Sequence, residues 1–292
     1  MRRTLLFLGI LGGCAGVDVG DGDDGVPPEP IYSCLGATTI DADGAVSAWR
    51  IDGAHVPETV DEADQLGLNI DCDPDGRADN ALGRAVAIVY QFESSNLNAE
   101  IAELIASGRL VHRLDLQTTD LHDAAGVGVT LVDPVDTGGA AEHPAAGFIV
   151  HGRLRAGGGE LPLAITLPSV DDVMILPVRG ASIDATFDEG RLAGRLGGAV
   201  PVDAVDTILL PFVHLSLSRA IERDCPDGTC ADGSFGEDVL ALFDADGDNQ
   251  LTLEELRDSA LVRALLTPDV DLVGHDGIPD GLSIGLGFTA TP

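Results

Sequence analysis

The sequence predicts an α+β protein with an antiparallel β-sheet or sandwich of about seven strands, flanked by helices and followed by a C-terminal helix–loop–helix. The first observation is a change in apolar spacing, from helical before Gly108 to alternating after it. The second is that turns containing Gly and Pro separate the alternating segments, which favours antiparallel connections. The chain has 292 residues, of which 45% are hydrophobic, so it can bury a sizeable core.

Two helices are expected before this change. Residues 81–92 carry apolar side chains at roughly helical spacing, as do residues 97–105, and Gly108 ends the second helix. The expected strands are residues 110–117, 126–132, 148–155, 161–167, 173–178, 181–187 and 191–200. A helix over residues 203–222 follows and is expected to kink at Pro211. Its most apolar part contains Asp206 and His214, so we do not expect it to span a membrane.

The most regular polar pattern in the chain is the twelve-residue segment 244–255. Oxygen-bearing side chains recur at its positions 1, 3, 5, 7, 9 and 12, namely Asp244, Asp246, Asp248, Gln250, Thr252 and Glu255. Ca²⁺ takes six to eight oxygen ligands, and this spacing can wrap such a set around one ion. The segment resembles an EF-hand loop, except that Asn249 stands at position 6, where glycine is usual. Asn tolerates positive φ, which preserves the turn.

The EF-hand resemblance implies a role for each of these residues. The three aspartates would bind Ca²⁺ through their side chains, and Gln250 through its backbone carbonyl. Thr252 would bind directly or through water, and Glu255 would be bidentate. Ser234 with Glu237, and Thr252 with Glu255, fit the capping box and predict helix starts on both sides of the loop. The alternative is an Asp- and Gly-rich surface turn that binds no ion.

A second loop has a similar aspartate spacing, at Asp71, Asp73, Asp75 and Asp79. It resembles the calcium loops of thrombospondin type-3 repeats, and an EF loop that has Leu82 in place of the final Glu. A third, degenerate copy contains Asp276 and Asp280. EF loops often pair through a short β-bridge, so either copy is a candidate partner for residues 244–255. The alternative for both is an Asx turn that caps the next helix or strand.

The N-terminus predicts export. Arg2 and Arg3 precede a short apolar run, and residues 11–14 (LGGC) resemble a bacterial lipobox, which implies acylation of Cys14. An ordinary secretory signal is the alternative. We therefore expect a signal peptide over residues 1–13, a flexible acidic tether over 14–32, an α+β domain with a β-rich core over 33–230 and an EF-hand-like unit over 231–292.

Four further cysteines are expected to form disulfides in an exported chain. Three pairings are possible, and we favour Cys225 with Cys230, which are separated by a short turn, and therefore Cys34 with Cys72. Zinc binding is the alternative, although no second close cysteine pair and no nearby histidine support it.

Charge and motifs limit the function. The net charge of −33 disfavours binding to nucleic acids, whose phosphates must be neutralised, and favours divalent cations. The catalytic and nucleotide-binding motifs that we searched for are absent, so we do not predict an enzyme. The layout resembles predicted lipoproteins of GC-rich bacteria, which implies a lipid-anchored protein of the cell envelope, in the outer membrane.

The expected function is calcium-stabilised binding or scaffolding at the cell surface, with an envelope polymer or a protein as partner. One alternative is a surface hydrolase that acts on glycans or peptides through a carboxylate pair. Another is a dockerin-like assembly module, although dockerins carry two similar loops.

Overall fold

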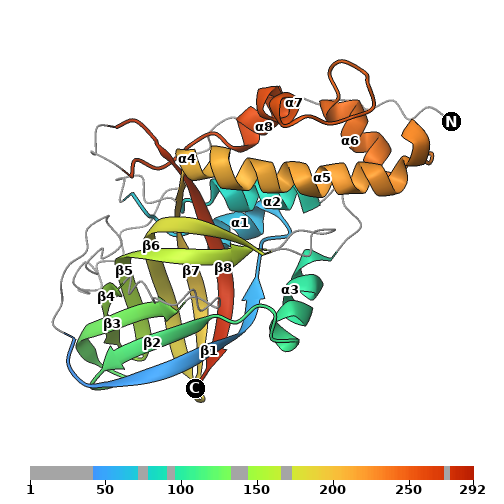
Figure 1. Cartoon of the computed structure of the whole chain (residues 1–292). Coiled ribbons are helices and arrows are strands. Elements are labelled where there is room, and N and C mark those ends of the chain that lie inside the picture. Colours follow the sequence, from blue (N-terminus) through green and yellow to red (C-terminus); the bar gives the residue numbers. More distant parts are fainter. Residues whose placement is uncertain (1–41, 72–77, 91–95, 133–143, 166–172, 273–276) are drawn as a thin grey trace. The chain divides into compact units, whose positions relative to one another are not determined.

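Eight antiparallel strands form a closed barrel, in which each strand pairs with its neighbours in sequence and β8 pairs with β1 (Figure 1). The computed structural model describes residues 42–71, 78–90, 96–132, 144–165, 173–272 and 277–292. The strands are β1 (Ala45–His55), β2 (Arg113–Thr118), β3 (Ala124–Val132), β4 (Pro144–Val150), β5 (Arg153–Ile165), β6 (Met174–Asp188), β7 (Arg191–Pro201) and β8 (Gly281–Thr291).

The α+β class and the antiparallel pairing are confirmed, but the sheet is neither open nor a sandwich. The two strands that close it, β1 and β8, were not predicted. In β8 apolar residues alternate with Ser, Gly and Thr from Leu282 to Thr291, and both faces of the strand are buried because α1 and α2 pack against it. In β1 the alternation is weak, and only Trp49 and Ile51 are fully buried.

Further strand predictions were wrong in their bounds, including that for residues 161–167, whose described part belongs to β5. Residues 148–155 are not one strand, because His151 (φ 50°) and Gly152 (φ 75°) reverse the chain between β4 and β5. The segments 173–178 and 181–187 belong to a single strand, β6. Gly180 (φ 59°) lies where the register between β6 and β7 shifts. This irregularity falls inside β6 and does not end the strand.

The barrel is filled by its own side chains. Leu114 and Leu116 of β2 and Leu154 of β5 are completely buried and belong to one apolar cluster with the inward residues of the other strands. A partly open hollow beside Val129 and Leu161 has a volume of about 20 Å³, enough for one water molecule. This hollow therefore has no room for a larger ligand.

The helices are α1 (Val60–Leu66), α2 (Ala81–Tyr90), α3 (Leu97–Ala106), α4 (Val202–Ala204), α5 (Leu210–Asp224), α6 (Phe235–Phe243), α7 (Leu253–Asp258) and α8 (Ala260–Leu265). A π-helical turn, η1 (Val205–Leu209), joins α4 to α5, and a 3₁₀ turn, η2 (Pro226–Gly228), follows α5. The predicted helices over residues 81–92 and 97–105 correspond to α2 and α3. Helix α1 was not predicted.

The helix expected over residues 203–222 is observed as the continuous run α4–η1–α5. Pro211 cannot donate a backbone hydrogen bond, and its ring crowds the preceding turn, so the wider π-turn η1 before it accommodates the proline. By length and composition alone, Val202–Asp224 could cross a membrane, a criterion that a packed core helix also meets. This run packs against α6 and α7.

A buried asparagine fixes the helices on the barrel. The Asn80 side chain donates to the carbonyls of Ala63 in α1 (2.8 Å) and Gly285 in β8 (3.1 Å). Its oxygen accepts from the amides of Gly83 in α2 (3.0 Å) and Gly285 (2.7 Å). Because all four hydrogen bonds are satisfied, a fully buried polar group is tolerated here and ties three elements together.

Candidate metal centre

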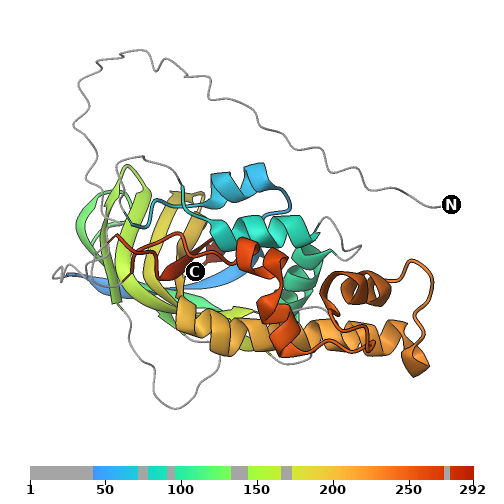
Figure 2. The same cartoon turned by 90° about the horizontal axis from the view of Figure 1, so that it is seen from above.

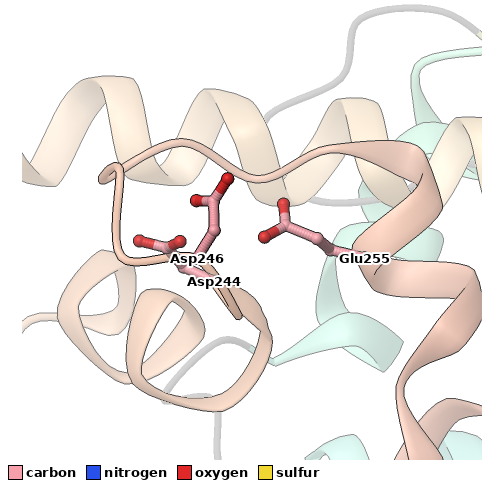
Figure 3. Close-up of side chains that lie close together, drawn as sticks. All are labelled: Asp244, Asp246 and Glu255. Carbon is pink, nitrogen blue, oxygen red and sulfur yellow. The ribbon is translucent and has the colours of Figure 1, made fainter.

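The carboxylates of Asp244, Asp246 and Glu255 face one another across the loop between α6 and α7 (Figure 3). One oxygen from each lies within 4.8 Å of the others. Among the described residues, this is the one group of three or more metal-ligating side chains that lie this close together. It brings together positions 1, 3 and 12 of the segment that the sequence singled out.

The loop folds around the first aspartate. The carboxylate of Asp244 accepts hydrogen bonds from the backbone amides of Gly247 (2.8 Å), Asp248 (3.2 Å) and Asn249 (2.8 Å). Asn249 has φ 63°, so it adopts the left-handed conformation that was expected at position 6. An aspartate that binds successive amides thus turns the chain and carries its own carboxylate to the inside of the loop.

Glu255 joins the two ends of the loop. Its Oε1 atom accepts from the amide of Ala245 (2.9 Å), and its Oε2 atom accepts from the amide (2.9 Å) and hydroxyl (2.8 Å) of Thr252. The Thr252 hydroxyl accepts in turn from the Glu255 amide, so the predicted capping box is complete and α7 begins at Leu253. These hydrogen bonds, from the Thr252 amide and hydroxyl first, lower the pKa of Glu255.

The pKa of Asp246 reflects the repulsion between the carboxylates of the loop. The amide of Asp248 donates to Asp246 and lowers its pKa, but the charges of Asp248, Glu255 and Asp244 together raise it above its ordinary value. A divalent cation between the carboxylates would relieve this repulsion, whereas protons would compete with the cation for the same oxygens.

The other predicted ligands lie in the same loop with different contacts. The carboxylate of Asp248 accepts from the amide of Gln250 (2.8 Å), and Thr252 bonds to Glu255 as described. At the first predicted helix start, Ser234 caps the amide of Glu237, while Glu237 bonds to Gly233 rather than back to Ser234. The second helix is short, because Ser259 (φ −56°, ψ 128°) ends α7 and separates it from α8.

Helix α5 is hydrogen-bonded to the loop over residues 244–255. His214 Nε2 lies 2.8 Å from the carbonyl oxygen of Leu251, the buried residue at position 8 of the loop. Because a carbonyl can only accept, Nε2 donates this hydrogen bond. The sequence did not indicate this role, since His214 stands on an apolar helix and its partner is 37 residues away.

The base of this helical unit is also fixed. Cys225 and Cys230 form the predicted disulfide, with an S–S distance of 2.11 Å. The carboxylate of Asp224, at the end of α5, accepts from the amide of Gly236 in the first turn of α6 (3.0 Å). The disulfide closes the connection that follows α5, and the hydrogen bond holds the first turn of α6 against the end of α5. Cys14, Cys34 and Cys72 lie outside the described residues, as does all of residues 1–32, so the lipid anchor, the tether and the Cys34–Cys72 pairing stay predictions.

The second Asp-rich loop is organised differently. The carboxylate of Asp79 accepts from the amide of Ile70 (2.8 Å), and a β-bridge from Leu68 to Asp79 closes the loop on itself. Burial, together with the charges of Asp71 and Asp269, raises the pKa of Asp79 to about 6 despite this hydrogen bond. Asp73 and Asp75 lie outside the described residues.

The third loop closes in the same way, through a bridge from Val270 to Gly281. Asp269 accepts from the amide of Ser283 (2.8 Å), and Asp280 accepts from the amide of Leu272 (2.6 Å), while Asp276 lies outside the described residues. The second and third loops share a small apolar cluster formed by Leu68, Ile70, Ala199 and Val270. Their bridges are internal, so neither bridge is the pairing with residues 244–255 that was considered.

A surface groove of about 520 Å³ adjoins the loop, between the end of α6 and the start of α8. Leu242 and Leu261 line it with exposed fractions of 59% and 43%, and Glu254 and Asp258 add negative charge. Apolar side chains with this exposure beside the loop form a candidate contact surface.

No protein-family model, no curated protein and no solved structure matches this chain.

Proposed function

We propose that residues 244–255 bind one Ca²⁺ ion and that this ion stabilises a protein of the bacterial cell envelope. The observation that supports the proposal is the convergence of Asp244, Asp246 and Glu255, whose carboxylates repel one another. Carboxylate oxygens are the ligands that Ca²⁺ prefers, and a net charge of −33 attracts divalent cations to the protein.

In this proposal the loop works as an EF-hand-like clamp. Asp244, Asp246 and Asp248 supply side-chain oxygens, Gln250 supplies its carbonyl, and Glu255 spans from α7 to the start of the loop. Thr252 contributes its hydroxyl directly or through a water. Extracellular calcium modules bind at ~10⁻⁴–10⁻³ M, which keeps such sites filled outside the cell, so we propose a structural role for the ion.

Calorimetric titration with Ca²⁺ tests this site. The wild-type domain is expected to bind one ion in the loop, and Asp246→Asn is expected to weaken that binding at least tenfold. Asp238→Asn is the matched control, because it removes the same charge from an exposed position on neighbouring α6. Equal weakening in both variants would assign the effect to net charge alone, and absence of heat in the wild type would reject the site.

We propose that the chain is anchored through acylated Cys14 and acts in binding or scaffolding at the cell surface. Labelling of cells with radioactive palmitate tests the anchor: label is expected in the wild type and in Cys34→Ser, and not in Cys14→Ser. Label retained in Cys14→Ser would mean that this cysteine is not the acylated residue. This part of the proposal rests on the N-terminal sequence pattern.

We propose the groove beside the loop as the binding surface. Its exposed Leu242 and Leu261, with Glu254 and Asp258 beside them, fit an amphipathic peptide that carries arginine or lysine. A fluorescent peptide of this composition is expected to bind the wild type and to bind Leu242→Ser/Leu261→Ser more weakly. Binding that is unchanged in the double variant would place the contact elsewhere.

A further inference from the structure

Two histidines that are distant in the sequence meet at one end of the barrel. His122 lies in the connection between β2 and β3, and His151 forms the turn between β4 and β5. Their ring centroids are 6.0 Å apart, with the ring planes inclined by 69°. The turns after β2, β4 and β6 share one end of an antiparallel barrel, whereas β7 runs into α4 at the other end.

Asp123 holds the two histidines together. Its Oδ1 atom accepts from the backbone amide of His151 (2.9 Å), and its Oδ2 atom bonds to Nδ1 of the His122 ring (2.5 Å). The backbone adds a further link, because the amide of Gly152 donates to the carbonyl of His122 (2.8 Å). Two hydrogen bonds thus join the two turns, and a third, within the connection between β2 and β3, orients the His122 ring.

The hydrogen bond to Asp123 also determines which ring nitrogen of His122 can act as a ligand. A carboxylate oxygen accepts hydrogen bonds, so in the contact between Asp123 Oδ2 and the His122 ring the Nδ1 atom donates its proton. In the neutral ring the lone pair is then at Nε2. Metal-binding histidines commonly have this arrangement, in which a carboxylate orients the ring through its other nitrogen.

The spacing of the rings is compatible with one shared ion. With a metal–nitrogen bond of ~2.1 Å, an ion lies ~3 Å from the centre of each imidazole that binds it, so two rings on one ion have centroids ~5–6 Å apart. The observed 6.0 Å falls at the upper end of this range. A side-chain rotation, with no movement of the barrel, would bring the second ring to the ion.

We propose that His122 and His151 bind one divalent transition-metal ion through their imidazole nitrogens, with Asp123 as the positioning residue. Imidazole suits Zn²⁺, Cu²⁺ and Ni²⁺, whereas the oxygen ligands of the loop over residues 244–255 suit Ca²⁺. The two sites therefore differ in ligand chemistry as well as in position, and this inference does not depend on the calcium site. Water or a partner completes the coordination.

Electron paramagnetic resonance with Cu²⁺ tests the proposal, because coupling to imidazole nitrogen distinguishes this site from carboxylate sites. The mature domain is loaded with substoichiometric Cu²⁺ in excess Ca²⁺, which occupies oxygen sites. The wild type is expected to show coupling to two nitrogens, and His122→Ala and His151→Asn are each expected to lose one and to bind at least tenfold more weakly. Asn keeps the left-handed backbone at position 151 (φ 50°) without an imidazole.

Asp123→Asn is expected to weaken Cu²⁺ binding by about 10–100-fold while both nitrogens still couple to the ion, as for a positioning residue. The matched control is His55→Ala, which removes another exposed histidine that is paired with a carboxylate, that of Glu62, at 2.5 Å. Its spectrum is expected to be unchanged. The proposal is overturned if the wild type shows no nitrogen coupling, or if the coupling survives in the His122→Ala/His151→Asn double variant.

Discussion

The loop over residues 244–255 and the two loops around Asp79 and Asp269 are all rich in Asp and Gly, but their carboxylates serve different purposes. In the first loop, three carboxylates point at one another from a surface position. In the other two, the carboxylates of Asp79, Asp269 and Asp280 each accept a backbone amide beside a shared apolar cluster.

Among the described residues, segments with a similar Asp and Gly content thus arrange their carboxylates in different ways. The loops differ in the helix or strand that follows each of them. After Thr252 the chain enters α7, and Glu255 in its first turn reaches back to the loop. After Asp280 it enters β8, and after Asp79 it enters α2. Both of these loops are bonded to β8, the one through Ser283 and the other through Asn80, which bonds to Gly285.

The largest expected effect is the loss of calcium stabilisation in Glu255→Gln. An ion at one hundred times its Kd stabilises the native state by ~2.7 kcal/mol, which corresponds to a rise in Tm of roughly 5–10 °C for a domain of this size. Thermal unfolding in Ca²⁺ and in EGTA is expected to show this rise in the wild type and in Glu254→Gln, whose side chain is exposed next to the site. A rise that persists in Glu255→Gln would remove this residue from the site.

The second effect concerns the loops around Asp79 and Asp269. Asp269→Ala is expected to destabilise the domain by about 1–3 kcal/mol, because the amide of fully buried Ser283 loses its acceptor. The loss should be equal in Ca²⁺ and in EGTA when measured by urea unfolding. Asp43→Ala, at an exposed position before β1, is the control. A loss that appears only in Ca²⁺ would show that Asp269 binds the ion and would remove the contrast between the loops.

The third effect depends on pH. Burial raises the pKa of Asp79 from 3.8 to about 6, so the folded state holds this proton more tightly than the unfolded state. The contribution of Asp79 to the free energy of unfolding therefore falls as pH rises from about 4 to about 6, and this contribution does not change further above that range. In EGTA, Asp79→Asn is expected to be more stable than the wild type by about 1 kcal/mol at pH 7, after allowance for solvent screening, and equal to it below pH 4.

The same experiment in Ca²⁺ sharpens the comparison. If the ion abolishes the advantage of Asp79→Asn at pH 7, the loop of Asp71 to Asp79 binds calcium as well. A difference in Tm between variant and wild type that is the same at pH 4 and pH 7 would show that the Asp79 carboxylate is not desolvated.

The smallest expected effect is at His214. Loss of its hydrogen bond to Leu251 is expected to destabilise the loop over residues 244–255 by about 1 kcal/mol. The Kd for Ca²⁺ should therefore rise roughly fivefold in His214→Ala. His214→Gln, whose amide can donate to the same carbonyl, should recover part of the affinity. Equal affinities in wild type and His214→Ala, measured by calorimetry, would show that α5 only packs beside the loop.

Local patterns determined much of this protein. The spacing from Asp244 to Glu255, the capping box at Thr252 and the tolerance of Asn249 for positive φ placed three carboxylates in one loop before any tertiary contact was known. The Cys225–Cys230 pair followed from a short turn, and α2, α3 and the strands β2, β3 and β7 followed from apolar periodicity. These features depend on neighbours within a few residues, so a linear pattern contains them.

The tertiary structure decided the rest. Closure of the barrel depends on β1 and β8, which pair across almost the whole chain, and the alternation of apolar residues in β8 does not identify its partner strands. The hydrogen bond of His214, the meeting of His122 with His151 and the use of Asp79 and Asp269 as backbone acceptors join residues that are brought together only by the fold. No periodicity records such contacts, because each depends on where a distant element packs.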